Sequence, residues 1–264
     1  MNATVSEFHY GMITPIAAYL MATLGAALGL RCTTRSLRNA GGERGIAWLT
    51  LGAVSIGCGI WTMHFIAMIG FSVQGALVGY DTSMTLLSLL VAIAVVAVGV
   101  FLVGFRGAGP LNLGVAGTFT GLGVAAMHYL GMAALQTGGT VHYDLTTVLL
   151  SVVIAVVAAT AALWAAVSIS AVWATLGASL VMGGAVSLMH YTGMSAVTVS
   201  LVSGNSAPSA DTGQLSLLLI MLAGPMTVLL LAGVIVMFDP EVVLGQGDWN
   251  RKQARRSVRE TAGV

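Results

Sequence analysis

Three copies of a six-residue string place imidazole and thioether groups at matching positions in an otherwise apolar chain. The strings run from Met63 to Met68, from Met127 to Met132 and from Met189 to Met194, at steps of 64 and 62 residues, and the second residue of each is a histidine. Ionisable side chains inside a membrane are costly, so they indicate function there. The repetition predicts one shared site.

The donor types in these strings are those of a soft-metal site. On a helix a His and the Met four residues later share a face, whereas the Met that precedes each His lies about 100° round the helix, so ligation by all three side chains of one string is strained. Imidazole and thioether without carboxylate favour copper, cycling through Cu(I), over zinc; haem is the weaker alternative, since His and Met are both axial ligands. The candidate ligands are Met63, His64, Met68, Met127, His128, Met132, Met189, His190 and Met194.

A structural reading of the same residues is open as well. A single buried His is usually a hydrogen-bonded structural residue, and Met commonly fills irregular gaps in a core. Three copies in equivalent places favour a functional unit that has been reused.

The composition predicts an all-α membrane protein. Hydrophobic residues make up 57% of the chain and charged residues 7%, and the mean hydropathy is +0.95, which excludes a soluble domain. Uncharged runs of about 20 residues can each span a bilayer as a helix. The seven predicted spans are 12–30, 46–71, 84–103, 111–135, 146–167, 172–199 and 215–238. We therefore expect one membrane domain over residues 1–238, a basic tail over 239–264, the lipid bilayer as surroundings and no nucleic-acid partner.

The basic residues predict the orientation, because they are retained on the cytoplasmic side of membrane spans. All ten lie in the first loop, the third loop or the tail, whereas the opposite side carries only acids. The amino terminus is therefore expected outside and the carboxyl terminus in the cytoplasm, with the first span retained as a helix. The second, fourth and sixth spans then carry their histidines at one depth, roughly 10 Å below the outer boundary. Gly57, Gly121 and Gly183 precede the three motifs in register and predict that these spans pack together.

The three strings, the run 57–62 before the first, and the pairs Tyr80-Asp81 and Tyr143-Asp144 resemble the MHYT domain, a bacterial integral-membrane sensor module. The resemblance covers the chain from about Phe8 to Phe238. It implies three motif-bearing two-helix repeats in the bacterial cytoplasmic membrane and a sensor that is not an enzyme. It also implies that the motif residues coordinate copper near the outer face and detect oxygen, carbon monoxide, nitric oxide or the redox state.

The chain departs from that family's pattern in four places. Phe65 replaces Tyr and Ala67 replaces Gly in the first motif, no Tyr-Asp pair follows the third, and only 26 residues follow Phe238 where many relatives carry an output domain. A standalone form is therefore expected, which would pass its signal to a separate cytoplasmic partner. The stripe of Arg251, Arg255 and Arg259 in the tail is a candidate surface for that partner or for anionic lipid.

Two other functions fit the same residues. A copper transporter could pass the ion between Met and His groups, but the donors lie at one depth, with only Met84 and Met182 elsewhere to continue a relay. A haem-binding redox protein would normally show paired histidines in two layers. A retinal protein is excluded, because the only lysine, Lys252, lies in the tail. Trp61 could cover the site or simply pack beside it, and the roles of Tyr129 and Tyr191 stay open.

Overall fold

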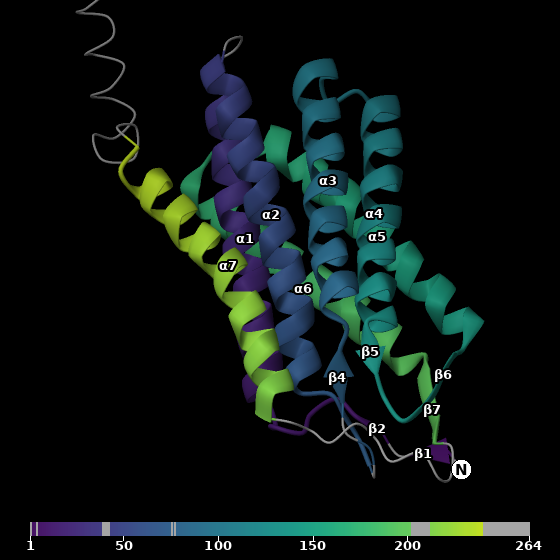
Figure 1. The fold of residues 1–264 in the computed structure, drawn as a ribbon. Helices are drawn as coiled ribbons and strands as arrows, with labels where there is room; N and C mark the ends of the chain where they lie inside the picture. Colours follow the sequence, from purple (N-terminus) through teal and green to yellow (C-terminus); the bar gives the residue numbers. More distant parts are fainter. Residues whose placement is uncertain are drawn as a thin grey trace, which may run out of the picture.

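Seven long helices make up most of the chain. The structure, a computed structural model, describes residues 2–3, 5–38, 43–74, 76, 78–201 and 212–239. The helices are α1 (Ile13–Arg38), α2 (Glu43–Ile69), α3 (Thr82–Arg106), α4 (Pro110–Ala133), α5 (Leu145–Ser168), α6 (Val172–Ser195) and α7 (Thr212–Met237) (Figure 1). All seven are long and apolar enough to cross a membrane, which confirms the predicted seven-helix membrane fold. The predicted tail, apart from Asp239, lies outside the described residues.

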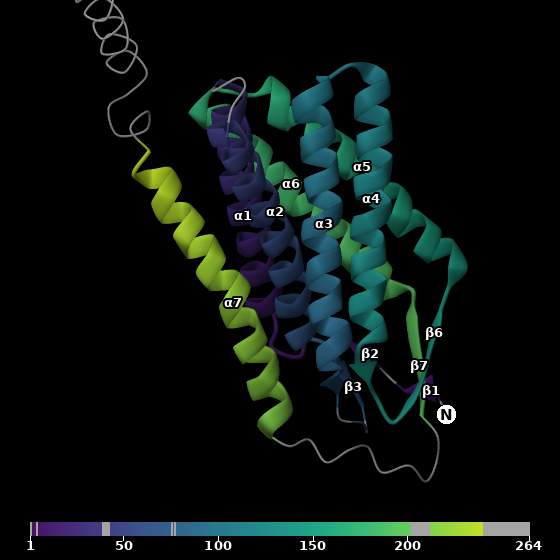
Figure 2. The same cartoon turned by 45° about the horizontal axis from the view of Figure 1, so that its top comes forward.

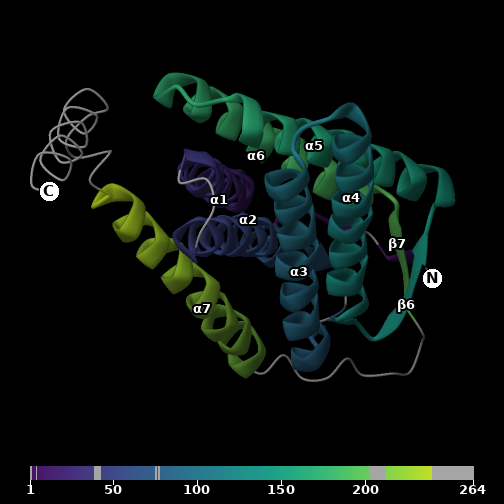
Figure 3. The ribbon, with the colours of Figure 1, turned by 90° about the horizontal axis from the view of Figure 1, so that it is seen from above.

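Six of the helices form a closed ring in chain order. Each of α1 to α5 packs on the next helix, and α6 packs back on α1, so three hairpins, α1–α2, α3–α4 and α5–α6, stand side by side. The second helix of each hairpin carries a motif. Helix α7 lies outside the ring, against α2 and α1 (Figure 3). The ring is therefore a three-fold repeat to which one further helix is added.

Short strands close one end of the ring, and an all-α description omits them. They are β1 (Asn2–Ala3), β2 (Val5–Ser6), β3 (Ser72–Val73), β4 (Gly79–Tyr80), β5 (Leu135–Gln136), β6 (Gly139–Tyr143) and β7 (Val197–Leu201). The strands pair as β2–β3, β4–β5 and β6–β7. In each pair, one strand precedes the first helix of a hairpin and the other follows a motif helix. Strand β1 pairs with the free edge of β7 (Figure 2). Strands of two residues are too short to show an alternating pattern in the sequence.

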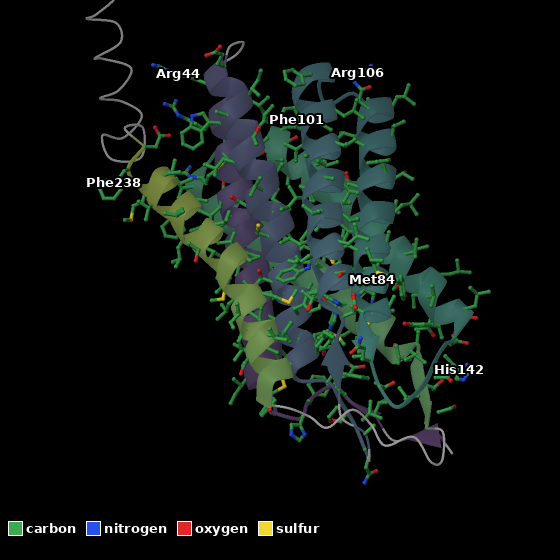
Figure 4. The ribbon with its side chains drawn as sticks, viewed as in Figure 1. Arg44, Met84, Phe101, Arg106, His142 and Phe238 are labelled. Atoms are coloured by element: carbon green, nitrogen blue, oxygen red, sulfur yellow. The ribbon has the colours of Figure 1, made fainter. Side chains whose placement is uncertain are left out.

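The two ends of the bundle differ in charge. Arg44 and Arg106 lie at one end, which we call the basic end, and His142 lies at the other, which we call the capped end (Figure 4). Of the described acids, Glu7, Asp81 and Asp144 lie at the capped end, while Glu43 and Asp239 lie at the basic end among the arginines. The separation of charge agrees with the predicted topology, while the side of the membrane that each end faces stays a prediction.

The small residues before the motifs pack differently from the prediction. Gly57, Gly121 and Gly183 lie against α3, α5 and α1, where an added Cβ would clash, and Gly59 and Gly123 lie against α1 and α3. Residues two apart point about 200° away from each other on a helix, so they face two different neighbours. The prediction that the motif helices pack directly together was therefore wrong: a motif-free helix separates each from the next, and they meet mainly near the capped end.

Candidate metal centre

The three motif histidines converge inside the ring. His64, His128 and His190 each lie five residues before the end of their helix, close to the capped end, and each is 1% exposed. At 1.5 Å per residue this places them about 7.5 Å below the helix ends. The ring centroids are 5.0, 5.0 and 5.1 Å apart, and the planes are close to perpendicular. The convergence predicted from their equal depth is therefore present.

The nitrogen atoms that face the centre are the Nδ1 atoms. The Nδ1 of His64 lies 3.0 Å from the Nδ1 of His190 and 3.2 Å from the Nδ1 of His128. Three imidazole nitrogens bound to one ion at about 2.0 Å in a trigonal arrangement would lie about 3.5 Å apart. The two distances from His64 would need to lengthen by only a few tenths of an ångström to hold an ion.

The opposite nitrogen atoms of His64 and His128 face away from the centre, toward Gly131 and Gly193. Among the described residues, Nε2 of His64 and Nε2 of His128 are buried without a hydrogen-bond partner. In a neutral imidazole one nitrogen carries the proton and the other accepts. Hydrogen bonds among the three rings can satisfy the central nitrogens only in pairs, whereas one cation satisfies all three lone pairs at once. The donor set therefore fits a metal ion.

Glycine in the next motif makes room for two of the rings. A Cβ at Gly131 would lie 2.5 Å from Nε2 of His64, and a Cβ at Gly193 would lie 2.5 Å from Nε2 of His128. In the second and third motifs the fifth position is therefore small because it faces the histidine of the preceding motif.

The charge of the cluster favours a monovalent ion. In the part of the chain that the structure describes, the group that could hold a metal consists of the three histidines, without carboxylate or thiol. A buried ion that neutral ligands do not neutralise costs more as its charge rises. On the ground of charge, neutral donors in an apolar setting therefore favour Cu(I) over Zn²⁺, while imidazole as a donor type suits either metal.

The six motif methionines fall into two sets. Met68, Met132 and Met194 lie in one buried cluster with Phe71, Val73, Val197 and Val199, and they follow the histidines by one turn toward the capped end. Met63, Met127 and Met189 are also buried, but Met63 packs in a separate cluster from the other two. The structure thus brings together the methionines that share a face with the histidines and separates those that precede them.

The aromatic residue after each histidine pairs with an aromatic residue before the next hairpin. Phe65 contacts Tyr80, Tyr129 contacts Tyr143, and Tyr191 stacks on Phe8, at centroid distances of 5.9, 5.9 and 5.8 Å. The same residues lie edge-on to the histidine before them, at 4.7 to 5.0 Å. Since Phe65 occupies an equivalent position without a hydroxyl group, the shared role of this position is packing around the imidazole.

The Tyr-Asp pairs begin helices and join neighbouring repeats. Asp81 caps α3 by accepting a hydrogen bond from the Met84 N–H at 2.8 Å, and Asp144 caps α5 with the N–H and hydroxyl of Thr147. The hydrogen bond from the Thr147 hydroxyl, together with that from the N–H, lowers the pKa of Asp144. The pairs are therefore structural.

The third equivalent of the Tyr-Asp pair stands at the amino terminus. The N–H of Asp81 donates to the carbonyl of Ala134, and the N–H of Asp144 to that of Ala196, just after a motif helix; the N–H of His9 donates in the same way to Gly70 at 3.0 Å. Residues 203–208, after the third motif, lie outside the described residues. The position is filled by Phe8 and His9, because α1 closes the ring.

The remaining candidates lie away from the three nitrogen atoms. Trp61 of α2 is fully buried, donates from Nε1 to Ser88 of α3 at 2.9 Å and packs on Phe65, so it braces the motif helix against α3 rather than covering the site. His9 and His142 are exposed at the capped end. Met84 lies in the first turn of α3, at the capped end, so it does not extend a relay toward the basic end (Figure 4).

Two serines escaped the sequence reasoning. Ser88 binds Trp61, and Ser151 lies 2.6 Å from the hydroxyl of Tyr129; each comes seven residues after the capping aspartate of its helix. That shared offset from Asp81 and Asp144 is a signal in the sequence that could have found them.

Comparison with known proteins identifies the repeat. The family model MHYT, described as a bacterial signalling protein N terminal repeat, matches residues 57–116 and 121–179. The third motif lies beyond the matched ranges, yet its contacts repeat those of the other two. No solved structure matches the chain.

Several signalling proteins resemble the chain over part of their length. It is 38% identical over 228 residues to the bifunctional diguanylate cyclase/cyclic di-GMP phosphodiesterase MucR of Pseudomonas aeruginosa, covering 84% of this chain and 31% of MucR. It is 40% identical over 163 residues to the cyclic di-GMP phosphodiesterase NbdA of the same organism, covering 60% and 21%. An uncharacterized signaling protein of Caulobacter vibrioides is 38% identical over 185 residues, covering 68% and 22%. The chain thus spans less than a third of each of these relatives.

Proposed function

The chain belongs to the MHYT family, and we propose that it is a membrane sensor that binds one copper ion through His64, His128 and His190 and responds to a diatomic gas. The observation that carries this proposal is the buried triangle of Nδ1 atoms, with two edges of 3.0 and 3.2 Å. Copper, when bound, would supply a position at which oxygen, carbon monoxide or nitric oxide could coordinate. The proposed location is the bacterial inner membrane, with the capped end outside.

The proposal assigns different roles to the surrounding residues. The three imidazoles hold the ion, and Met68, Met132 and Met194 are the further candidate ligands, because they follow the histidines on the same faces. Phe65, Tyr129 and Tyr191 hold the rings in place from the side. The methionine cluster and the paired strands exclude water from the site at the capped end.

The cyclic contacts give the site a means of signalling. His64 lies on Gly131 of the second hairpin, and His128 lies on Gly193 of the third. A change in the position of one ring therefore acts on the neighbouring hairpin, and a ligand that favours one arrangement shifts the packing equilibrium of the whole ring. The relatives named as signalling proteins support this role. A cytoplasmic partner, or an output domain as in relatives of greater length, would receive the signal.

Metal analysis of the purified protein tests the proposal. We expect about one copper per chain by mass spectrometry, and a loss of about 10- to 100-fold in Cu(I) affinity when His64, His128 or His190 is changed to Ala. His9→Ala and His142→Ala are the matched controls, because both side chains are exposed. Equal loss in all five variants would indicate general destabilisation, and iron with a haem spectrum would favour the redox alternative.

Copper transport is the second candidate function, and it differs from sensing in that the ion would cross the membrane. The nine motif Met and His donors lie within two turns of helix near the capped end, and toward the basic end Met182 is a single further thioether on a largely apolar wall. We therefore expect no catalysed copper uptake into sealed vesicles that contain the protein. Uptake that disappears when Met68, Met132 and Met194 are replaced together by Leu would make transport the better explanation.

A further inference from the structure

An apolar cavity lies inside the ring, next to the histidines on the side toward the basic end. It has a volume of about 60 Å³, and all six ring helices line it. Ile60, Val124 and Val186 line its wall, one helical turn before His64, His128 and His190, and Met189, which directly precedes His190, lines it as well. Five alanines of α5 form much of the remaining wall. The cavity therefore occupies the middle of the spans, beneath the candidate metal centre.

The chemistry of the wall excludes most ligands. The lining has one polar side chain, that of Thr120, whose hydroxyl already donates to the carbonyl of Val95 at 3.4 Å. Buried water needs two to four polar partners, so a space of this composition stays dry, and apolar cavities of this kind bind xenon or small apolar molecules. An ion or a polar metabolite would lose its hydration without replacement.

We propose that this cavity is a binding chamber for a small nonpolar gas molecule of diatomic size, and that the gas reaches the histidines from it. The ligand is small because the chamber has room for only a few water-sized molecules, and nonpolar because the wall offers nothing to a polar one. The capped side is closed by the methionine cluster and the strand pairs, so a gas dissolved in the bilayer has its shortest apolar route through the ring. The route from the cavity to the histidines rests on the proposed function, whereas the binding of gas in the cavity does not.

Ala159 of α5 is the residue with which to test the chamber. It lines the cavity, and Phe or Leu at this position would fill the space, the smaller change serving as a second variant should Phe overpack the ring. Ala161 on the same helix is exposed and does not line the cavity, so Ala161→Phe is the matched control.

Xenon is the first probe, because it reports a nonpolar site without copper. Crystals of the full chain under xenon pressure should show anomalous density between α3, α5 and α6 in the unaltered protein and in Ala161→Phe, and none in Ala159→Phe or Ala159→Leu. Absence of xenon from the chamber of the unaltered protein, or equal density in the filled variants, overturns the chamber.

Carbon monoxide is the second probe, used on the Cu(I)-loaded protein. After flash photolysis, its rebinding should be about tenfold slower in the filled variants than in Ala161→Phe, with the copper content unchanged. Equal rebinding rates overturn the access route even if xenon binds. Xenon in the chamber of a protein that binds no copper would retain the chamber while refuting the proposed function, so the two failures are distinguishable.

Discussion

Replacing Gly131 by Ala should weaken copper binding without unfolding the protein. The added Cβ would lie 2.5 Å from Nε2 and 3.0 Å from Cδ2 of His64, whereas ordinary contact begins at 3.4 Å. The imidazole must therefore retreat by about 1 Å, which is far more than the few tenths of an ångström by which the nitrogen triangle must open. A misplaced ligand of this kind should cost about 10- to 100-fold in Cu(I) affinity, as for other groups that orient metal ligands.

The measurement is competition with a Cu(I) chelator, made in parallel with a thermal melt. Gly114→Ala is the matched control, since Gly114 lies on the same helix with nothing within 4 Å of its added Cβ. Alanine is favoured over glycine in a helix by up to about 1 kcal/mol, so the control should keep its melting temperature or exceed it. Unchanged affinity in Gly131→Ala would refute the assignment of Nδ1 as the inward atom, and equal loss in Gly114→Ala would attribute the effect to the helix.

Two further outcomes follow from the contacts around the site. Asp81→Ala should destabilise the protein by about 1 kcal/mol in a thermal melt, because the N–H of Met84 loses its capping acceptor. Asp81→Asn should retain most of that stability, because asparagine also caps helices. Equal melting temperatures of the two variants would contradict the capping role. Tyr129→Phe should leave the copper content unchanged, since Phe65 occupies the equivalent position, although the hydroxyl of Ser151 loses its partner; loss of copper would instead make the phenol a ligand.

The meeting of the three histidines was predictable, but its atomic arrangement was not. The spacing of the histidines and the lengths of the apolar runs predict three imidazoles at one depth, and the structure confirms that they meet. Which nitrogen faces inward depends on the rotation of each helix and on the glycine opposite, here Gly131 and Gly193, about 65 residues further along the chain. A periodic pattern within one helix carries no information about a contact of that kind.

The order of the repeats was the feature that sequence reasoning missed. The sequence places the Tyr-Asp pairs after the first and second motifs, so the third was expected after the last one. A ring closes through space, however, and the contact made by Asp81 and Asp144 is made in the third repeat by His9, at the other end of the chain. The side chain of Phe8 likewise takes the place of a tyrosine against Tyr191. A closed repeat can therefore look incomplete when it is read along the chain.

This closure makes α1 the element that links the centre to the basic end. At the capped end, the segment just before α1 contacts two motif helices: Phe8 stacks on Tyr191 of α6, and the N–H of His9 donates to the carbonyl of Gly70 after α2. At the basic end, Arg35 of α1 forms an ion pair at 2.8 Å with Asp239, which follows the outer helix α7. Both charged groups are largely buried, so separating them is costly. Among the ring helices, α7 packs extensively only on α1 and α2. A displacement of the α1–α2 hairpin would therefore move both His64 and the start of the tail at Asp239.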